Sequence, residues 1–168
     1  MAYRFGLTYL LTQRYCCVGM IPDFDVDGNL PPGRHRGGWK EFEKRFGTSF
    51  RRQRLLAGMK RMLLSLKDAG CGRVFMDGSF VSAKANPRDY DGCWDRAGMD
   101  LSKLLKRDPV LLDFANKRLA QKFKYGGEMF PADLVEAISG TVFLEFFERD
   151  KDSGEQKGVV EIDLGELS

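Results

Sequence analysis

Residues 75–94 read FMDGSFVSAKANPRDYDGCW, and this stretch holds the most informative pattern in the chain. The run Arg73–Asp77 predicts a short buried strand that stops abruptly at Gly78-Ser79. After nine intervening residues, Asp89-Tyr90-Asp91 lies on a second predicted strand. Residues i and i+2 of a strand point to the same face, so we expect the two aspartates to project side by side.

This pair of carboxylates predicts a cation site next to a phosphate-binding turn. Adjacent carboxylates repel each other unless a cation lies between them, and Mg²⁺ prefers oxygen ligands. Gly78 lets the backbone approach a phosphate closely, and Ser79 offers a hydroxyl and an amide. Lys84 and Arg88, between the two halves, could neutralise a triphosphate. The alternative is an ordinary turn followed by surface acids, but the joint spacing favours the functional interpretation.

The arrangement resembles the polymerase-beta-like nucleotidyltransferase superfamily. Its signature is an apolar strand, Gly-Ser or Gly-Gly, a spacer, and then Asp-apolar-Asp or Glu. The chain is also similar, over about residues 20–165, to a group of small bacterial nucleotidyltransferase-like proteins. The stretches that carry this second resemblance are IPDF at 21–24, LPPG at 30–33, FEKRFG at 42–47, DGSFV at 77–81 and FPA at 130–132.

The resemblance implies a minimal nucleotidyltransferase fold, with a mixed central sheet flanked by helices. It implies Mg²⁺-dependent transfer of a nucleotidyl group from a nucleoside triphosphate to a hydroxyl of a protein or nucleic acid. Two Mg²⁺ ions, or Mn²⁺ in their place, would be held by Asp89 and Asp91, with Gly78 and Ser79 as the phosphate cradle. Small bacterial proteins of this superfamily often look like members of toxin–antitoxin or phage-defence pairs, so the resemblance also implies a partner protein (toxin or antitoxin). A nucleotide- or RNA-binding module without turnover is the alternative.

The superfamily usually supplies a third carboxylate from a later strand, and the sequence leaves its identity open. Asp133 follows a predicted strand at Glu128–Ala132 and is the first choice for a third catalytic and metal-binding residue. The alternatives are Asp163, Glu161 and Glu145. If none of these carboxylates lies near Asp91, nucleotide binding without catalysis becomes the better interpretation.

The remaining periodicity predicts a mixed α+β (α/β-like) domain. Helices are expected at Trp39–Phe46, from a Thr48 or Ser49 cap to about Ala69, and at Val110–Phe123. Strands are expected at Arg73–Asp77, Tyr90–Trp94 and Glu128–Ala132, followed by a hairpin of Thr141–Glu148 and Gly158–Leu164. Residues 21–38 are rich in turn-forming dipeptides and are predicted to be loop.

Length and composition are typical of one globular domain. The chain has 168 residues, and we predict a domain at 21–168 after an extension at 1–20 that is not native, with Met20 as the initiator. No apolar run approaches the ~20 residues that span a bilayer, which argues against an integral membrane protein. The four cysteines form no C-x-x-C pair, so a reduced cytoplasmic location is expected.

Charge is unevenly distributed along the chain. Residues 34–67 contain eleven Lys or Arg and two acids, whereas the rest of the chain is net acidic. This asymmetry predicts a surface that meets an anion, such as a phosphate or RNA. A solvated basic helix face is the alternative. The Arg51-Arg52-Gln53-Arg54 cluster opposes the dipole of its predicted helix, so helix stability alone does not account for it.

Overall fold

The computed structural model describes residues 21–151 and 153–168, and the predicted extension at 1–20, with its Met20 start, lies outside them. The described chain folds around a five-stranded mixed sheet with strand order β1-β5-β2-β3-β4. The strands are β1 Gly33–Gly37, β2 Arg73–Asp77, β3 Asp91–Trp94, β4 Glu128–Pro131 and β5 Gly158–Asp163. The pairs β1–β5 and β3–β4 are parallel, and β2 is antiparallel to both β5 and β3.

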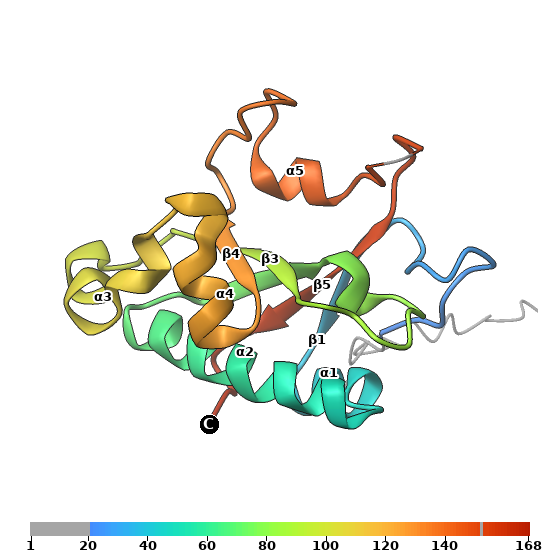
Figure 1. Cartoon of the computed structure of the whole chain (residues 1–168), viewed down its shortest axis with the longest axis horizontal. Coiled ribbons are helices and arrows are strands. Elements are labelled where there is room, and N and C mark those ends of the chain that lie inside the picture. Colours follow the sequence, from blue (N-terminus) through green and yellow to red (C-terminus); the bar gives the residue numbers. More distant parts are fainter. Residues whose placement is uncertain (1–20, 152) are drawn as a thin grey trace, which may run out of the picture.

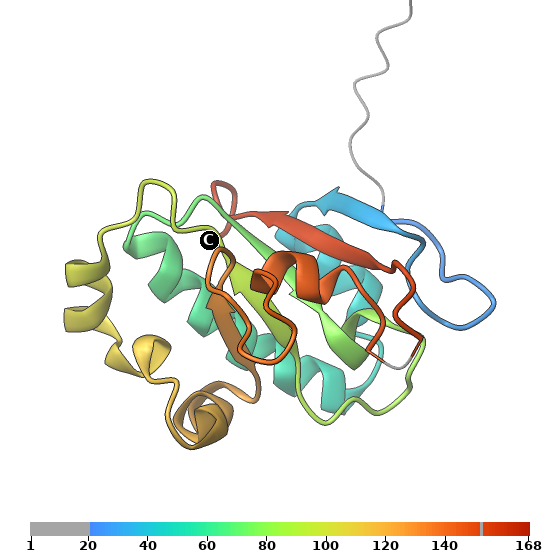
Figure 2. The ribbon, with the colours of Figure 1, turned by 90° about the horizontal axis from the view of Figure 1, so that it is seen from above.

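Helices cover both faces of this sheet. The long helices α1 (Trp39–Phe46) and α2 (Phe50–Asp68) lie under one face, and the short α5 (Phe143–Phe147) lies over the other (Figure 1). Figure 2, seen from above, shows α5 across the strands. Two further helices, α3 (Leu101–Arg107) and α4 (Leu119–Tyr125), lie toward the β4 end of the sheet. The predicted α+β class with a mixed central sheet flanked by helices is confirmed.

The predicted first two helices are confirmed with their ends. Gly47 ends α1, and the Ser49 hydroxyl caps α2 by accepting a hydrogen bond from the backbone N–H of Arg52 at 3.3 Å. The apolar face of α2 is fully buried against the sheet at Met59, Met62, Leu63 and Leu66. Burying this face, rather than propensity alone, stabilises so long a helix.

Alternate residues of β2, β3 and β4 enter two separate cores. One set of residues faces α1 and α2 and belongs to the main core: Val74, Met76, Trp94 and Met129. The other set faces α5 and joins Phe147 and Val159 in a smaller core: Phe75, Cys93 and Phe130. Both faces of β2 are therefore apolar, which explains the continuous apolar run in its sequence.

The predicted C-terminal hairpin is wrong. Phe143–Phe147 forms helix α5 instead of a strand, because Phe147 and Phe143 pack on Phe130 of β4, with ring centroids 6.1 Å and 3.8 Å from it. The second half of the hairpin is correct as a strand, but β5 lies between β1 and β2 in the interior of the sheet. Local alternation could not distinguish these arrangements, since both use the same apolar residues.

Three other expectations differ from the structure. Residues 33–37 form the edge strand β1, although GRHRG has no strand-like composition, because its backbone pairs with β5. The helix α3 was missed. The predicted helix at Val110–Phe123 is broken, since residues 116–118 have φ between 48° and 57°, a left-handed conformation.

In the described part of the chain, no helix is long and apolar enough to cross a membrane.

Candidate functional site

Three acidic residues form a row across the neighbouring strands β2, β3 and β4, where these strands begin or end. Asp77 is the last residue of β2 and pairs with Asp91, the first residue of β3. Asp91 pairs in turn with Glu128, the first residue of the parallel strand β4. Each lies two residues from a member of the smaller apolar core, so the row continues that face of the sheet beyond its apolar part.

The Gly-Ser turn lies directly beside this row. After β2, the chain turns through a short 3₁₀ helix, Gly78–Val81. Gly78 has φ +77°, and a Cβ at this position would lie 2.5 Å from Oδ2 of Asp91. Two features favour glycine at this position, the left-handed backbone and the carboxylate that lies against it.

The second aspartate of the predicted pair lies just outside the strand. Asp89 precedes β3, while Tyr90 between the two aspartates is completely buried in the main core. Asp89 and Asp91 are both half-buried and line the same cavity, but they do not share a strand, because β3 begins only at Asp91. Lys122 of α4 approaches Asp89 at 3.6 Å.

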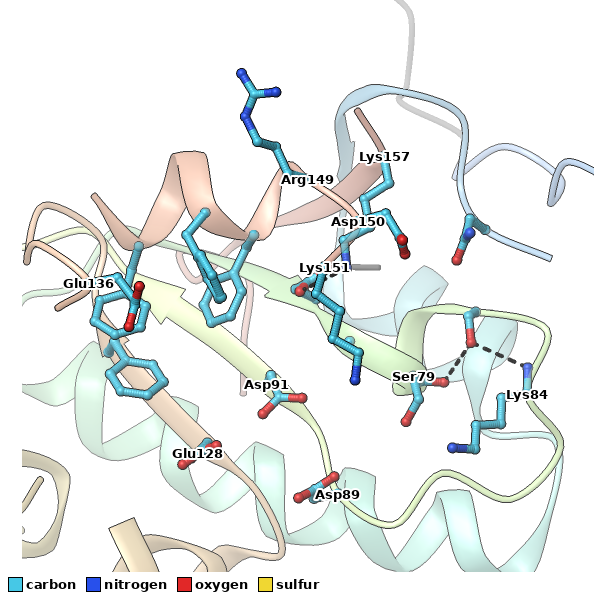
Figure 3. A pocket seen from close by; sticks show the side chains of 18 of the residues that line it. Ser79, Lys84, Asp89, Asp91, Glu128, Glu136, Arg149, Asp150, Lys151 and Lys157 are labelled. Atoms are coloured by element: carbon cyan, nitrogen blue, oxygen red, sulfur yellow. Dashed lines mark hydrogen bonds and ion pairs between the residues drawn. The ribbon is translucent and has the colours of Figure 1, made fainter. Parts of the chain in front are cut away.

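This cavity has a volume of about 640 Å³ and contains most of the predicted site residues. Figure 3 shows Asp91, Asp89 and Glu128 on one side and Ser79 and Lys84 on the other, with the Lys151 side chain between them. The predicted residues that line the cavity are Gly78, Ser79, Lys84, Arg88, Asp89 and Asp91. At its far end the wall is aromatic, formed by Phe130, Phe143, Phe146 and Phe147.

The surroundings shift the pKa values of the carboxyl groups at the cavity in different directions. Burial, together with the negative charges of Asp89, Glu128 and Asp77, raises the pKa of Asp91 to about 7. Burial also raises the pKa of Asp77, although Lys157 opposes the shift from 2.9 Å. Asp91 is therefore a buried carboxyl group with three further acids around it.

Glu128, rather than the predicted Asp133, is the carboxylate that lies beside Asp91 from strand β4. Burial opposes ionisation of Glu128, but hydrogen bonds from Arg118 and Lys122 hold its pKa below the usual value. Asp133 is exposed, pairs with Arg96 and does not line the cavity. Sequence order favoured Asp133, whereas strand register placed the first residue of β4 beside Asp91.

The other candidates for this role also lie elsewhere. Glu161 pairs with Arg36 and Arg73, and Asp163 lies opposite Arg73, at the end of β2 remote from Asp77. Glu145 is exposed on α5 and is not part of the cavity wall. An acid at the first position of a predicted strand was the available signal for Glu128.

Two arginines at the start of α2, Arg51 and Arg52, hold the turn region in place. Arg52 is 3% exposed, and its guanidinium donates to the backbone carbonyls of Phe80, Ser82 and Lys84 at 2.6–3.0 Å. Arg51 donates to the carbonyl of Pro87 at 3.2 Å. The loop between the Gly-Ser turn and Asp89 is thus fastened to α2 by charged donors.

The donor set fits a divalent cation only together with a substrate. Within residues 21–151 and 153–168, no three His, Cys, Asp or Glu side chains are grouped closely enough to hold a metal ion. Mg²⁺ in proteins is commonly held by one or two carboxylates, with water and substrate phosphates completing the octahedron. Asp89 and Asp91 could supply that pair, and the uncompensated charge at Asp91 favours a cation there.

A comparison with known families places residues 22–163 in a family of unknown function (DUF6932). The chain belongs to DUF6932. This match covers the whole sheet, the acidic row and the Gly-Ser turn. No curated protein and no solved structure matches the chain significantly. Membership of DUF6932 assigns no activity, so the functional argument depends on the cavity itself.

Proposed function

We propose that this protein is a Mg²⁺-dependent nucleotidyltransferase that moves a nucleotidyl group from a nucleoside triphosphate to a hydroxyl of a protein or nucleic acid. One observation carries the proposal: Asp89, Asp91 and Gly78-Ser79 line one cavity, although nine residues separate the two halves in sequence. The Asp91 carboxylate lies against Gly78, so a cation on the carboxylates would be close to phosphates on the turn.

The cavity offers complementary surfaces to both ends of a nucleoside triphosphate. Lys84, Arg88 and Lys151 line it and can neutralise phosphate oxygens. The aromatic wall around Phe143 and Phe146 offers a flat apolar surface for a base. A volume of about 640 Å³ lies within the range of small-molecule sites.

The proposed reaction is an in-line displacement at the α-phosphorus. The acceptor oxygen forms a bond to this phosphorus, the bond to the bridging oxygen breaks, pyrophosphate leaves with the electron pair, and the hydroxyl proton passes to water. Bound Mg²⁺ would supply charge neutralisation at the phosphates and lower the pKa of the acceptor hydroxyl. Ser79 and Lys84 would hold the triphosphate, while Asp89 and Asp91 would hold the cation.

Binding without turnover is the second candidate, and one observation favours it. Glu128, the third carboxylate, is engaged by Arg118 and by Lys122 at 3.1 Å. These two cations neutralise Glu128 within the protein and leave it less available to a metal ion. A protein of this kind would hold a triphosphate in the same cavity but transfer nothing.

Transfer of label distinguishes the two candidates. The full chain is incubated with each nucleoside triphosphate, labelled at the α-phosphate, in Mg²⁺ and cell lysate. We expect labelled macromolecules with wild type and with a control that removes two acids outside the cavity, Asp95→Asn/Asp133→Asn, but not with Asp89→Asn/Asp91→Asn. Equal labelling with all three proteins contradicts the proposed nucleotidyltransferase activity of this cavity. Triphosphate binding without any transfer by wild type supports the second candidate.

A further inference from the structure

A second cavity, of about 570 Å³, adjoins the first and is strongly basic. It lies where the end of α4 meets α2 (Figure 1), and it shares Arg88 and Asp89 with the first cavity. Its wall contains one acid, Asp89, and six cations: Arg51, Arg54, Arg61, Arg88, Lys122 and Lys124. We call this cavity with its lining the basic groove.

The close contact of the two helices shapes the basic groove. A Cβ at Gly58 of α2 would lie 1.9 Å from the carbonyl oxygen of Tyr125, so only glycine permits this approach. Arg54 and Arg61, four residues before and three after Gly58, share its face of the helix and therefore flank the contact. Arg61 also donates to the carbonyl of Lys124 at 3.0 Å.

The four arginines of the basic groove keep their positive charge, whereas its two lysines are paired with acids. Among the described residues, no carboxylate forms an ion pair with Arg51, Arg54, Arg61 or Arg88. Lys122 is paired with Asp89 and Glu128, and Lys124 with Asp108. Four arginines around one groove repel one another, and a polyanion would relieve this repulsion. The groove is thus a surface of the kind that binds successive phosphates.

An exposed aromatic residue lies among these cations. Phe123 of α4 lines the groove and is 93% exposed, between Lys122 and Lys124 in sequence. A phenylalanine side chain that stays exposed to water contributes little to the stability of the fold, but a base can stack on its ring. Cations that track phosphates, together with an aromatic platform, match a single-stranded nucleic acid better than an acidic peptide, which has no bases to stack.

We infer that the acceptor is a single-stranded nucleic acid that lies in the basic groove, with its terminal hydroxyl directed past Arg88 and Asp89 into the cavity that holds the triphosphate. The role of the nucleic acid as acceptor depends on the proposed function, whereas its binding in the basic groove does not. Of the eleven basic residues in 34–67, three line the groove: Arg51, Arg54 and Arg61. The surface is therefore defined by the tertiary structure and not by the basic segment as a whole.

The test compares two double variants of equal charge in fluorescence anisotropy with short labelled RNA and DNA strands. Arg54→Ala/Arg61→Ala removes two groove cations, and Lys40→Ala/Lys44→Ala removes two exposed cations of α1 outside it. We expect the groove variant to bind at least about tenfold more weakly and its log–log salt slope to fall by roughly 1.4, as for two lost phosphate contacts. The α1 variant should behave as wild type.

A stacking variant tests the aromatic part of the inference. Phe123→Ala should weaken binding of single strands about tenfold and leave duplex binding unchanged. Thermal unfolding confirms that each variant is folded. Equal losses in the groove and α1 variants, or transfer of label exclusively to protein, would overturn the inference.

Triphosphate binding separates this inference from the proposed function. A fluorescent triphosphate analogue should bind wild type and Arg54→Ala/Arg61→Ala equally, since neither arginine lines the first cavity. If wild type binds the triphosphate analogue but no single strand, the inference about the basic groove is overturned and the proposed function is not. Single-strand binding without triphosphate binding overturns the proposed function and leaves the groove as a nucleic-acid site.

Discussion

The carboxylate of Asp91 lies against the α-carbon of Gly78, so a Cβ at Gly78 would be 2.5 Å from Asp91 Oδ2. This contact joins the two halves of the sequence motif. It brings the turn that would hold phosphates to the residue that would hold a cation. The first prediction tests whether the contact, rather than the backbone conformation alone, requires glycine.

Gly78→Ala should be more destabilising than Gly98→Ala, although both glycines have φ +77°. At Gly98 nothing lies within 4 Å of the added Cβ, so only backbone strain of about 1 kcal/mol is expected there. At Gly78 the Asp91 carboxylate must also move, and triphosphate binding should weaken. Chemical unfolding and analogue binding measure the two effects. Equal losses of stability would show that the contact with Asp91 is unimportant.

Without divalent cations, stability should fall as the pH rises from about 4 to about 7. The pKa of Asp91 is raised to about 7 in the folded protein, above its unfolded value near 3.8, so the folded state binds the extra proton in this window. The stabilisation is complete below the unfolded value and is lost through pH 7. Unfolding by urea at pH 5 and pH 8 should differ by about 1–3 kcal/mol from this carboxyl group.

The variant Asp91→Asn should shrink this pH difference. Asp95→Asn is the control, because a hydrogen bond from Ala97 N–H and the pairing with Arg73 hold the pKa of Asp95 below its usual value, outside the window. A wild type that is more stable at pH 8 than at pH 5, with the same trend in Asp91→Asn, would contradict the raised pKa.

Mg²⁺ or Mn²⁺ should raise the unfolding midpoint of wild type at pH 8 but not at pH 5. At pH 8 the carboxyl of Asp91 is ionised and can bind the cation, whereas at pH 5 the proton occupies it. Asp89→Asn/Asp91→Asn should show no metal-dependent shift. A shift of equal size in this double variant would place the bound cation elsewhere on the protein.

Arg52→Met should destabilise the protein by about 2–4 kcal/mol, because it leaves buried carbonyl oxygens without donors. Ser82 and Lys84 lose their anchor to α2, so cleavage by protease in this loop should become faster. Arg54→Met changes an exposed residue two positions later and should shift stability by less than about 0.5 kcal/mol. Similar unfolding midpoints for the two variants would refute the anchoring role.

Glu128→Gln should lower nucleotidyl transfer by about tenfold to a hundredfold, because it removes the charge that orders Arg118 and Lys122 beside Asp91. Asp133→Asn should leave transfer unchanged, since Asp133 pairs with Arg96 away from the cavity. The reverse ranking of the two variants would restore Asp133 as the third carboxylate.

Local patterns in the sequence were sufficient for part of this molecule. The 3.6-residue period and the Ser49 cap predicted α2, and an apolar run before glycine predicted β2. The relation between Gly78-Ser79 and the two aspartates is also local. The loop joins the end of β2 to the start of its antiparallel neighbour β3, so the turn and the aspartates lie at the same end of this strand pair. These features depend on neighbours in sequence, which periodicity and turn chemistry describe.

The third carboxylate, the inner position of β5 and the basic groove depended on tertiary structure. Glu128 is beside Asp91 only because β3 and β4 pair in parallel with both first residues in register. The groove forms because Gly58 lets α4 approach α2 and brings Lys122 and Phe123 to Arg54 and Arg61. Strand register and helix packing are chosen by burial of the whole core, so residues distant in sequence meet for reasons that no local pattern records.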